Sequence, residues 1–181
     1  MVKKLKIFKI FNVPKKFKKS IILIGNFDGL HSGHQKLFEL AKKYKKKYKS
    51  KLGVVTFDPI PKMFFNKNIK NYRISNLNQK VIYLKKFSVD FVINKKFDRN
   101  FSKITYYKFI KEILSRKLKS KFIFVSNNFR FGHKREGDVA LLKKYENDFG
   151  YNLINPTPLM KNKKIISSTI IRKLLEEGKL L

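Results

Sequence analysis

One loop of the chain combines residue types that can hold a chain of phosphates. It reads Gly25-Asn26-Phe27-Asp28-Gly29-Leu30-His31-Ser32-Gly33-His34-Gln35 and leads from an apolar run into an amphipathic stretch. Glycines let a backbone pass close to a ligand, and Asp-Gly is a turn signal. The first turn of a helix presents free N–H groups and a partial positive charge to an anion. Two histidines at that point can donate hydrogen bonds, or carry charge, to phosphate oxygens.

A purely structural interpretation of this loop stays open. Asp28 and Gly29 would then form only a turn, and His31 and His34 would be ordinary surface side chains. These two are among only three histidines in the chain, and both lie where a strand is expected to pass into a helix. Their position favours a phosphate cradle that lacks the lysine of a P-loop.

Aromatic residues and prolines mark a second kind of candidate site. Pro59 and Pro61 follow an apolar run and predict a stiff, extended loop. Phe57, Phe65 and Phe131 offer flat apolar faces on which a ring can stack. The chain contains 18 phenylalanines, so these three can equally belong to the core.

Polar residues near the ends of predicted elements complete the candidates. Asn128 follows an apolar run, where its amide can orient a phosphate or a ribose, or simply form a turn. Ser168 and Thr169 are expected as the N-cap of the last helix, a role compatible with anion contacts at the same helix end. Arg172, one turn further on, can reach that anion as a bidentate donor. His133 receives no role.

The elements that must position these residues alternate along the chain. Short apolar runs predict strands buried on both faces, as in a parallel sheet: Ile21–Gly25, Leu52–Phe57, Asp90–Ile93, Phe122–Ser126 and Tyr151–Ile154. Amphipathic stretches predict helices at Gly33–Lys47, Asn76–Phe87, Ser102–Leu118, Gly137–Phe149 and Ser168–Glu177, the last ended by Gly178. Together they predict a doubly wound α/β fold with a mostly parallel sheet. Such sheets bind ligands at the carboxyl ends of their strands, just after Gly25, Phe57 and Ser126.

The charge of the chain is strongly one-sided. It has 44 lysines and arginines against 12 acidic residues, a net charge of +32. Such a field attracts polyanions, so nucleic acid is one candidate partner. Only six of the 44 are arginine, and the lysines are spread from end to end, which favours an origin in A- and T-rich codons. We expect only non-specific attraction to nucleic acid.

The remaining composition narrows the setting. The chain has no cysteine, which excludes disulfides and thiolate metal sites. No apolar run approaches the length of a membrane span, and the first residues interleave lysine with apolar side chains, unlike a signal peptide. A cytoplasmic protein with no membrane partner is expected. The 181 residues suit a single domain, 1–181, and the sequence leaves the oligomeric state open.

Four ordered motifs resemble one enzyme family. His31-x-Gly33-His34 is similar to the signature of the nucleotidylyl transferases, which have a Rossmann-like fold, and the longer string GNFDGLHSGHQ resembles the bacterial FAD synthetases. Three segments that follow in the same order also resemble that family: VTFDPIP with Phe65, Asn128-Phe129-Arg130-Phe131-Gly132 with Gly137-Asp138, and Ile166-Ser167-Ser168-Thr169 with Arg172. The resemblance runs from about Ser20 to the C-terminus.

The resemblance implies that the chain transfers AMP from ATP to FMN, giving FAD and pyrophosphate, with Mg²⁺ bridging the phosphates. It implies catalytic roles for His31, His34, Asn128 and Arg172. It implies ATP contacts from Gly25, Phe27, Asp28, His31, Gly33, His34, Ser168, Thr169 and Arg172. It implies FMN contacts from Phe57, Pro59, Pro61, Phe65, Asn128 and Phe131.

The chain departs from the family pattern at several positions. Ile60, Ser126 and Ile170 stand where histidine, glycine and arginine are common, and Asn128 replaces the aspartate of many relatives. Many members continue into a riboflavin kinase domain, so this chain is expected not to convert riboflavin to FMN. Two other functions stay open: a related transferase that makes NAD, a coenzyme A precursor or a CDP-alcohol, and a basic nucleic-acid-binding protein on an inactive transferase fold.

Overall fold

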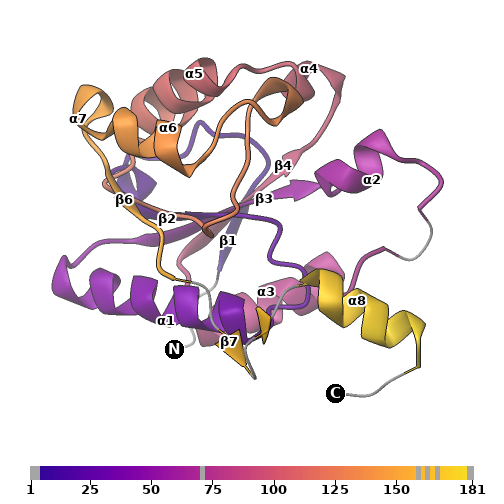
Figure 1. Cartoon of the computed structure of the whole chain (residues 1–181). Coiled ribbons are helices and arrows are strands. Elements are labelled where there is room, and N and C mark those ends of the chain that lie inside the picture. The colour runs from indigo at the N-terminus through magenta and orange to yellow at the C-terminus, as the bar shows by residue number, and fades with distance from the viewer. Residues whose placement is uncertain (1–4, 70–71, 158–159, 162–163, 166–167, 179–181) are drawn as a thin grey trace.

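A six-stranded sheet forms the centre of the computed structural model, which describes residues 5–69, 72–157, 160–161, 164–165 and 168–178 (Figure 1). The strands lie in the order β1-β4-β3-β2-β5-β6, and each neighbouring pair is parallel. They are β1 (Lys6–Phe8), β2 (Ile21–Ile24), β3 (Leu52–Asp58), β4 (Phe91–Lys96), β5 (Phe122–Phe124) and β6 (Asn152–Ile154). The five predicted strands are confirmed, with small changes at their ends.

The order of the strands reverses at the centre of the sheet, beside β2. From β2 the chain proceeds through β3 to β4 on one side, and then returns to β5 and β6 on the other. Ile21 of β2 aligns with Leu52 of β3 and with Phe122 of β5, so these strands point to the same edge. Loops at such a switch point diverge and leave room for a ligand. The loop that begins at Gly25 lies there.

Helices cover both faces of the sheet (Figure 1). On one face lie α1 (Ser32–Lys47), α3 (Leu77–Lys86) and α8 (Ser168–Glu176). On the other lie α4 (Arg99–Ser102), α5 (Tyr106–Lys108), the π-helical η2 (Phe109–Lys117), α6 (Val139–Lys144) and α7 (Glu146–Phe149). Ile21 and Leu23 pack in the core between the sheet and α1 and α3, and Ile22 and Ile24 pack in the core on the opposite face, with η2 and α6, so β2 is buried on both sides. The predicted doubly wound α/β fold is confirmed.

Two predicted helices are interrupted where side chains bind the backbone. The stretch Ser102–Leu118 is broken because Thr105 accepts a hydrogen bond from the Lys108 amide and starts a new helix, α5. The stretch Gly137–Phe149 begins only after Asp138, which caps α6, and it divides at Tyr145. Such local caps compete with a continuous helix, and hydrophobic periodicity does not reveal them.

Several short elements were not predicted. They are β1, η1 (Lys15–Phe17), α2 (Pro61–Phe65), α4, η3 (His133–Arg135) and the hairpin of β7 (Met160–Lys161) and β8 (Lys164–Ile165). The extended loop predicted after β3 is wrong beyond Ile60. Pro61 is the first residue of α2, a position that suits proline because its missing N–H is not needed there. The Asp58–Pro59 peptide bond is cis.

Candidate functional site

Buried apolar side chains hold the loop between β2 and α1 in an unusual backbone conformation. Phe27 and Leu30 have φ angles of 46° and 35°, and both side chains are buried. Gly29 has a φ of 77°, and a Cβ there would lie 2.9 Å from Ile74 Cγ2. Residues other than glycine rarely adopt such positive φ angles unless packing fixes the backbone there. The ring of Phe27 is therefore committed to the core, and only its backbone remains to face a ligand.

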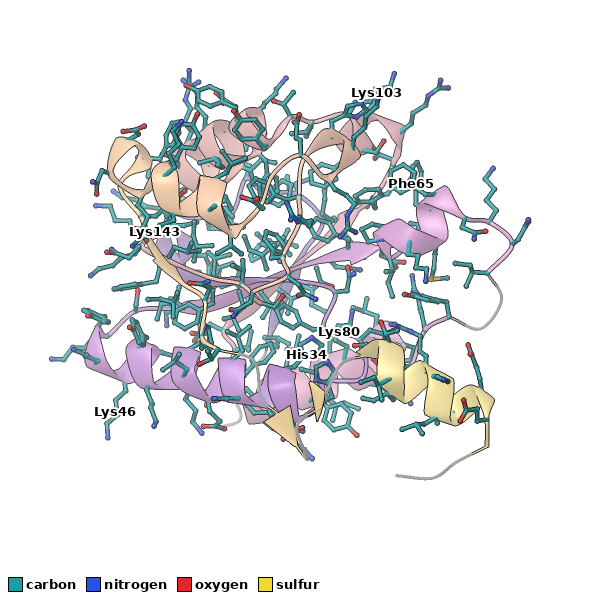
Figure 2. The ribbon with its side chains drawn as sticks, in the orientation of Figure 1. His34, Lys46, Phe65, Lys80, Lys103 and Lys143 are labelled. Carbon is teal, nitrogen blue, oxygen red and sulfur yellow. The ribbon has the colours of Figure 1, made fainter. Side chains whose placement is uncertain are left out.

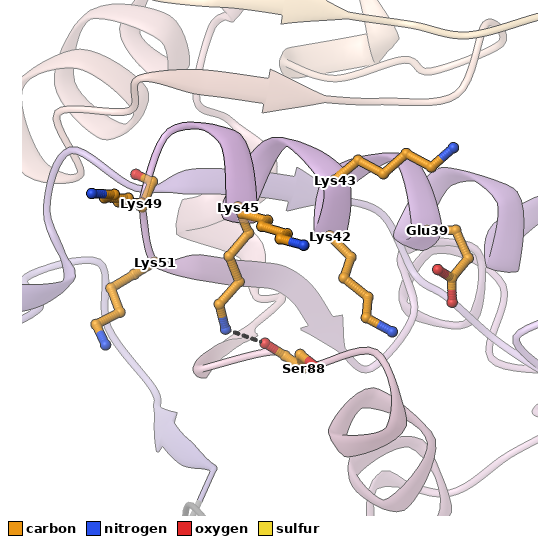
Figure 3. Close-up of a pocket in the computed structure, with 9 residues that line it drawn as sticks. Glu39, Lys42, Lys43, Lys45, Lys49, Lys51 and Ser88 are labelled. Atoms are coloured by element: carbon orange, nitrogen blue, oxygen red, sulfur yellow. Dashed lines mark hydrogen bonds between the residues drawn. The ribbon is translucent and has the colours of Figure 1, made fainter.

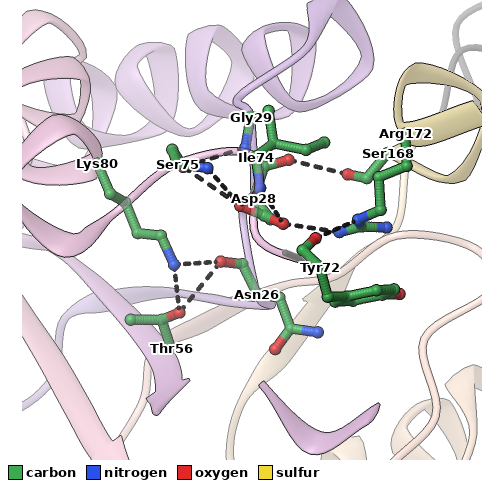
Figure 4. Close-up of polar contacts among 10 residues, drawn as sticks. All are labelled: Asn26, Asp28, Gly29, Thr56, Tyr72, Ile74, Ser75, Lys80, Ser168 and Arg172. Atoms are coloured by element: carbon green, nitrogen blue, oxygen red, sulfur yellow. Dashed lines mark hydrogen bonds and ion pairs between the residues drawn. The ribbon is translucent and has the colours of Figure 1, made fainter. Parts of the chain in front are cut away.

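Asp28 is the centre of a polar network rather than a simple turn residue (Figure 4). It is only 1% exposed, and its carboxylate accepts hydrogen bonds from the amides of Ile74, 3.1 Å away, and Ser75, 3.0 Å away. Arg172 Nη2 lies 2.7 Å from its Oδ2. Burial by itself raises the pKa of Asp28, but the Arg172 hydrogen bond, backbone hydrogen bonds and the Arg172 charge outweigh it and hold that pKa below its ordinary value. Asp28 therefore stays ionised and joins three segments.

The last helix is tied to this network. Arg172 Nε donates to the Tyr72 carbonyl oxygen at 2.8 Å, and its guanidinium carbon lies 3.9 Å from the centre of the Tyr72 ring. Ser168 Oγ donates to the Asp28 carbonyl oxygen at 2.9 Å. Because α8 begins at Ser168, the N-cap role predicted for Ser168 or Thr169 is wrong, and Thr169 is exposed. Ile166 and Ser167 lie outside the described residues.

The two histidines lie against each other at the N-terminus of α1. Their ring centroids are 3.8 Å apart with an interplanar angle of 24°, and the ring of Phe27 meets His34 edge-on. Both Nδ1 atoms are buried without a hydrogen-bond partner among the described residues. Burial, and then the Arg172 charge, lowers the pKa of His31, while burial, helped by His31, lowers the pKa of His34 to about 3. At neutral pH both rings are therefore uncharged, and each has one N–H that can donate a hydrogen bond.

The low pKa of His34 makes a prediction about stability. An unfolded histidine has a pKa of about 6.5, so between pH 6.5 and 3 the unfolded chain binds more protons at this position. The contribution of a neutral, half-buried His34 is therefore present above pH 6.5 and lost as pH falls through this window. We expect urea titrations followed by circular dichroism to give a lower free energy of unfolding at pH 5 than at pH 7. His34→Gln should reduce that difference, and an unchanged difference would contradict the assignment.

The predicted stacking residues occupy different environments. Phe131 is 8% exposed and packs on Phe109, with ring centroids 5.3 Å apart, so its ring is part of the core. Phe57 is half-buried and packs on Phe101. Phe65, on α2, is 69% exposed and is the accessible ring of the three (Figure 2).

The remaining candidates lie on loops at the same edge of the sheet. Asn128 is exposed after β5, and its Oδ1 accepts a hydrogen bond from Ser126 Oγ at 2.9 Å. Pro59 follows β3 directly. Because β3 and β5 flank β2, these loops and the histidine loop leave the same edge. The structure joins Asp28, Ser168 and Arg172 by direct contacts, whereas Phe57, Phe65 and Phe131 share only this edge of the sheet with the histidines.

Lys80 is a polar residue of the site that the sequence reading missed. It lies on α3, is 6% exposed, and its Nζ donates to the Asn26 carbonyl oxygen at 2.6 Å and to Thr56 Oγ1 at 3.3 Å. Burial lowers its pKa to about 8. A signal was present, because Lys80 falls three residues after Leu77 and four before Leu84, on the apolar face of the helix. This place on the helix distinguishes it from the many exposed lysines of the chain.

A hollow of about 580 Å³ lies at the opposite end of the sheet (Figure 3). Its walls are mostly lysines of α1 and of the segment before β3: Lys42, Lys43, Lys45, Lys46, Lys49 and Lys51. Lys45 is already paired with Asp90 at 2.7 Å. None of the predicted site residues lines it. Among the described residues there is no group of three or more His, Cys, Asp and Glu side chains that could hold a metal ion.

Comparisons with known proteins identify the family of the chain. The family model described as FAD synthetase matches residues 13–170. A bifunctional riboflavin kinase/FMN adenylyltransferase of Buchnera aphidicola is 41% identical over 93% of this chain and 54% of its own length. The Escherichia coli K12 protein of the same name is 34% identical over 88% of this chain and 51% of its own length. The chain thus spans about half the length of these relatives.

A solved structure supports the fold. The crystal structure of a protein named macrolide-efflux protein, from Streptococcus pneumoniae, superposes with a TM-score of 0.82 at 27% identity, over 97% of this chain and 67% of that one. Across the described part of this chain, no helix is both long and apolar enough to cross a bilayer. The matched family model and the bacterial relatives together show that the chain belongs to the FAD synthetase family.

Proposed function

We propose that this chain is an FMN adenylyltransferase, which joins the AMP part of ATP to FMN and releases FAD and pyrophosphate. The observation that carries the proposal is the pair of stacked, uncharged histidines at the N-terminus of α1, each with a buried Nδ1 that lacks a partner within the described residues. Each neutral ring has one N–H, which can donate to an oxygen of a polyphosphate at this helix N-terminus. The flavin substrate follows from the names of the relatives.

The proposed reaction is an in-line displacement at the α-phosphorus of ATP. The phosphate of FMN is largely dianionic at neutral pH and attacks without a general base. A bond forms between its oxygen and the α-phosphorus, and the bond to the bridging oxygen of pyrophosphate breaks. Negative charge grows on the α-phosphate oxygens and on the leaving group. His31, His34 and the N-terminus of α1 are the donors that stabilise it.

Arg172 has a different part in the proposal from the one that the sequence suggests. Its Nε and Nη2 are engaged by Tyr72 and Asp28, so it holds the histidine loop in place and adds positive charge nearby. Mg²⁺ enters the proposal as part of the substrate, bound to the phosphates of ATP. Gly25, Gly33, Ser168 and Thr169 are proposed to line the path of the phosphates.

The flavin is proposed to lie along the segments that follow β3 and β5. Phe57, Pro59, Pro61, Phe65 and Asn128 are the candidates, and among the phenylalanines Phe65 has the most exposed ring. Phe131 would support this surface from within the core instead of stacking on the ring. Residues 1–181 are proposed to form one transferase domain, with only non-specific attraction to nucleic acid.

Phe65→Ala should raise the KM for FMN more than the KM for ATP, because the exposed ring lies on the flavin side and belongs to no core cluster. Phe131→Ala should instead destabilise the fold by about 3–5 kcal/mol, the usual cost of removing a buried phenylalanine. Steady-state kinetics and thermal unfolding measure the two effects. A rise in the KM for ATP alone in Phe65→Ala would place the flavin elsewhere.

The direct test is to incubate the purified protein with FMN, ATP and Mg²⁺ and to measure FAD and pyrophosphate. FMN is then replaced by nicotinamide mononucleotide or by phosphopantetheine, which related transferases would use. FAD formed only with FMN supports the proposal. Turnover of one of the other acceptors with none of FMN would assign the chain to another branch, and no turnover with any acceptor would favour an inactive fold.

A further inference from the structure

Lys80 is a buried cation beside the loop that carries both histidines. It comes from α3, on the same face of the sheet as α1, and its Nζ reaches the Asn26 carbonyl oxygen at 2.6 Å (Figure 4). Asn26 lies between Gly25, where β2 has just ended, and Phe27, where the backbone takes a positive φ. The ammonium therefore binds the loop at the point where it departs from the sheet.

A second contact joins this anchor to the neighbouring strand. Lys80 Nζ lies 3.3 Å from Thr56 Oγ1, and Thr56 Oγ1 in turn donates to the same Asn26 carbonyl oxygen at 3.2 Å. Thr56 is fully buried in β3. The carbonyl is thus held from α3 and from β3 at once, which fixes the start of the loop in two directions.

The charge of Lys80 also acts on the phosphate site. Lys80 interacts electrostatically with four charged or titratable groups: Asp28 in the loop, Asp58 at the end of β3, Arg73 before α3 and His34 on α1. Its positive charge helps to lower the pKa of His34. A buried ammonium is costly unless hydrogen bonds compensate it, and a methionine would fit the apolar face of α3 at lower cost. Stability alone therefore does not account for a lysine here.

We propose that Lys80 is a positioning residue of the adenylyl-transfer site, which fixes the histidine loop through Asn26 and keeps a positive charge behind the phosphates. This inference rests on the proposed function, because the phosphates it serves are those of ATP. Lys80 is not placed in contact with the reacting atoms and acts through the loop.

The kinetic test compares Lys80→Met, Lys80→Arg and, as a matched control on the same helix, Lys85→Met, which removes an exposed lysine. Lys80→Met should lower kcat/KM for ATP by roughly 10²-fold, the scale expected when catalytic groups shift by about 1 Å. Lys80→Arg should recover most of the loss, and Lys85→Met should stay near the parent. Thermal unfolding of each variant checks that it is folded. A folded Lys80→Met within about twofold of the parent would overturn the inference.

The pH profile separates positioning from packing. Because the pKa of Lys80 is about 8, kcat/KM for ATP should fall as pH rises through that value, when the ammonium loses its charge. Arginine keeps its charge there, so the alkaline fall should be absent in Lys80→Arg. An unchanged alkaline fall in Lys80→Arg would show that Lys80 is not its source and would count against the inference.

A spectroscopic test does not depend on turnover. The chain has only three histidines, so their imidazole signals can be assigned by NMR. Lys80→Met should shift the signals of His31 and His34 and leave that of His133 in place, and Lys85→Met should shift none. If the parent forms no FAD, the proposed function fails, but this test still decides the inference. Unshifted His31 and His34 signals in Lys80→Met would overturn it.

Discussion

Replacing His31 or His34 by alanine should lower the rate of FAD formation by roughly 10²–10³-fold while the protein remains folded, which is the usual cost of removing one preorganised donor. Both rings lie at the N-terminus of α1, and both are uncharged before a substrate binds. As hydrogen-bond donors they require no reorganisation when charge develops on the α-phosphate. Single-turnover assays with FMN and ATP measure the chemical step.

The control for this prediction is His133→Ala. His133 lies in η3, with Nδ1 3.3 Å from the Ser102 carbonyl oxygen, and it belongs to none of the loops assigned to the site. Its removal should leave the rate within a few-fold of the parent. If His31→Ala and His34→Ala both behave like His133→Ala, the histidine pair does not stabilise the transition state and the mechanism proposed above is wrong.

Asp28→Asn should produce the second large effect, a loss of about 3–5 kcal/mol in the free energy of unfolding, as when one partner is removed from a buried ion pair. Arg172 would be left with an uncompensated charge. The NH₂ of the new amide would also face backbone N–H groups that now donate to the carboxylate. FAD formation should fall as well, since the same carboxylate joins the histidine loop to α8. Chemical unfolding followed by circular dichroism and the FAD assay report the two losses.

Asp138→Asn is the matched control for that substitution. Asp138 also pairs with an arginine, Arg130, at 3.0 Å, but Arg130 is exposed and Asp138 only half-buried, and asparagine caps α6 about as well as aspartate. The Asp138→Asn substitution should cost less than about 1 kcal/mol. If Asp28→Asn and Asp138→Asn lower the free energy of unfolding equally, the network described around Asp28 is wrong.

The network around Asp28 also makes stability depend on pH. Because the pKa of Asp28 lies below its ordinary value, the contribution of Asp28 to stability is present above about pH 4 and lost as pH falls further.

The sequence predicted the parallel strands and the helix that follows the histidine loop because burial on both faces leaves a local pattern. Residues such as Ile21–Ile24 are apolar throughout, and α1 repeats its apolar side chains at helical spacing. The strand-to-helix turn itself is encoded locally by glycines. These features depend on neighbours in the sequence, so one sequence is enough to find them.

The partners of the site residues depend on contacts across the fold, and the sequence could not supply them. Nothing near Asp28 indicates that its carboxylate is bound by the Ile74 amide and by Arg172. Phe131 and Phe65 have the same side chain, yet one is core and the other is exposed, which only the packing of α2 and η2 decides. The break at Thr105 likewise depends on a side-chain cap that competes with a continuous helix.

The attachment of α8 to the histidine loop has a consequence for the order of assembly during synthesis. The pair of Asp28 and Arg172 joins residues 144 positions apart in the chain. Once the first half of the polypeptide has left the ribosome, β2 and β3 can pair. The carboxylate of Asp28 then still lacks Arg172, which has not yet been synthesised. Contacts of such long sequence separation form late, because the intervening chain must be ordered first. The nascent protein therefore acquires its sheet before its binding loop is secured, and the loop is locked only when the last helix has emerged and docked.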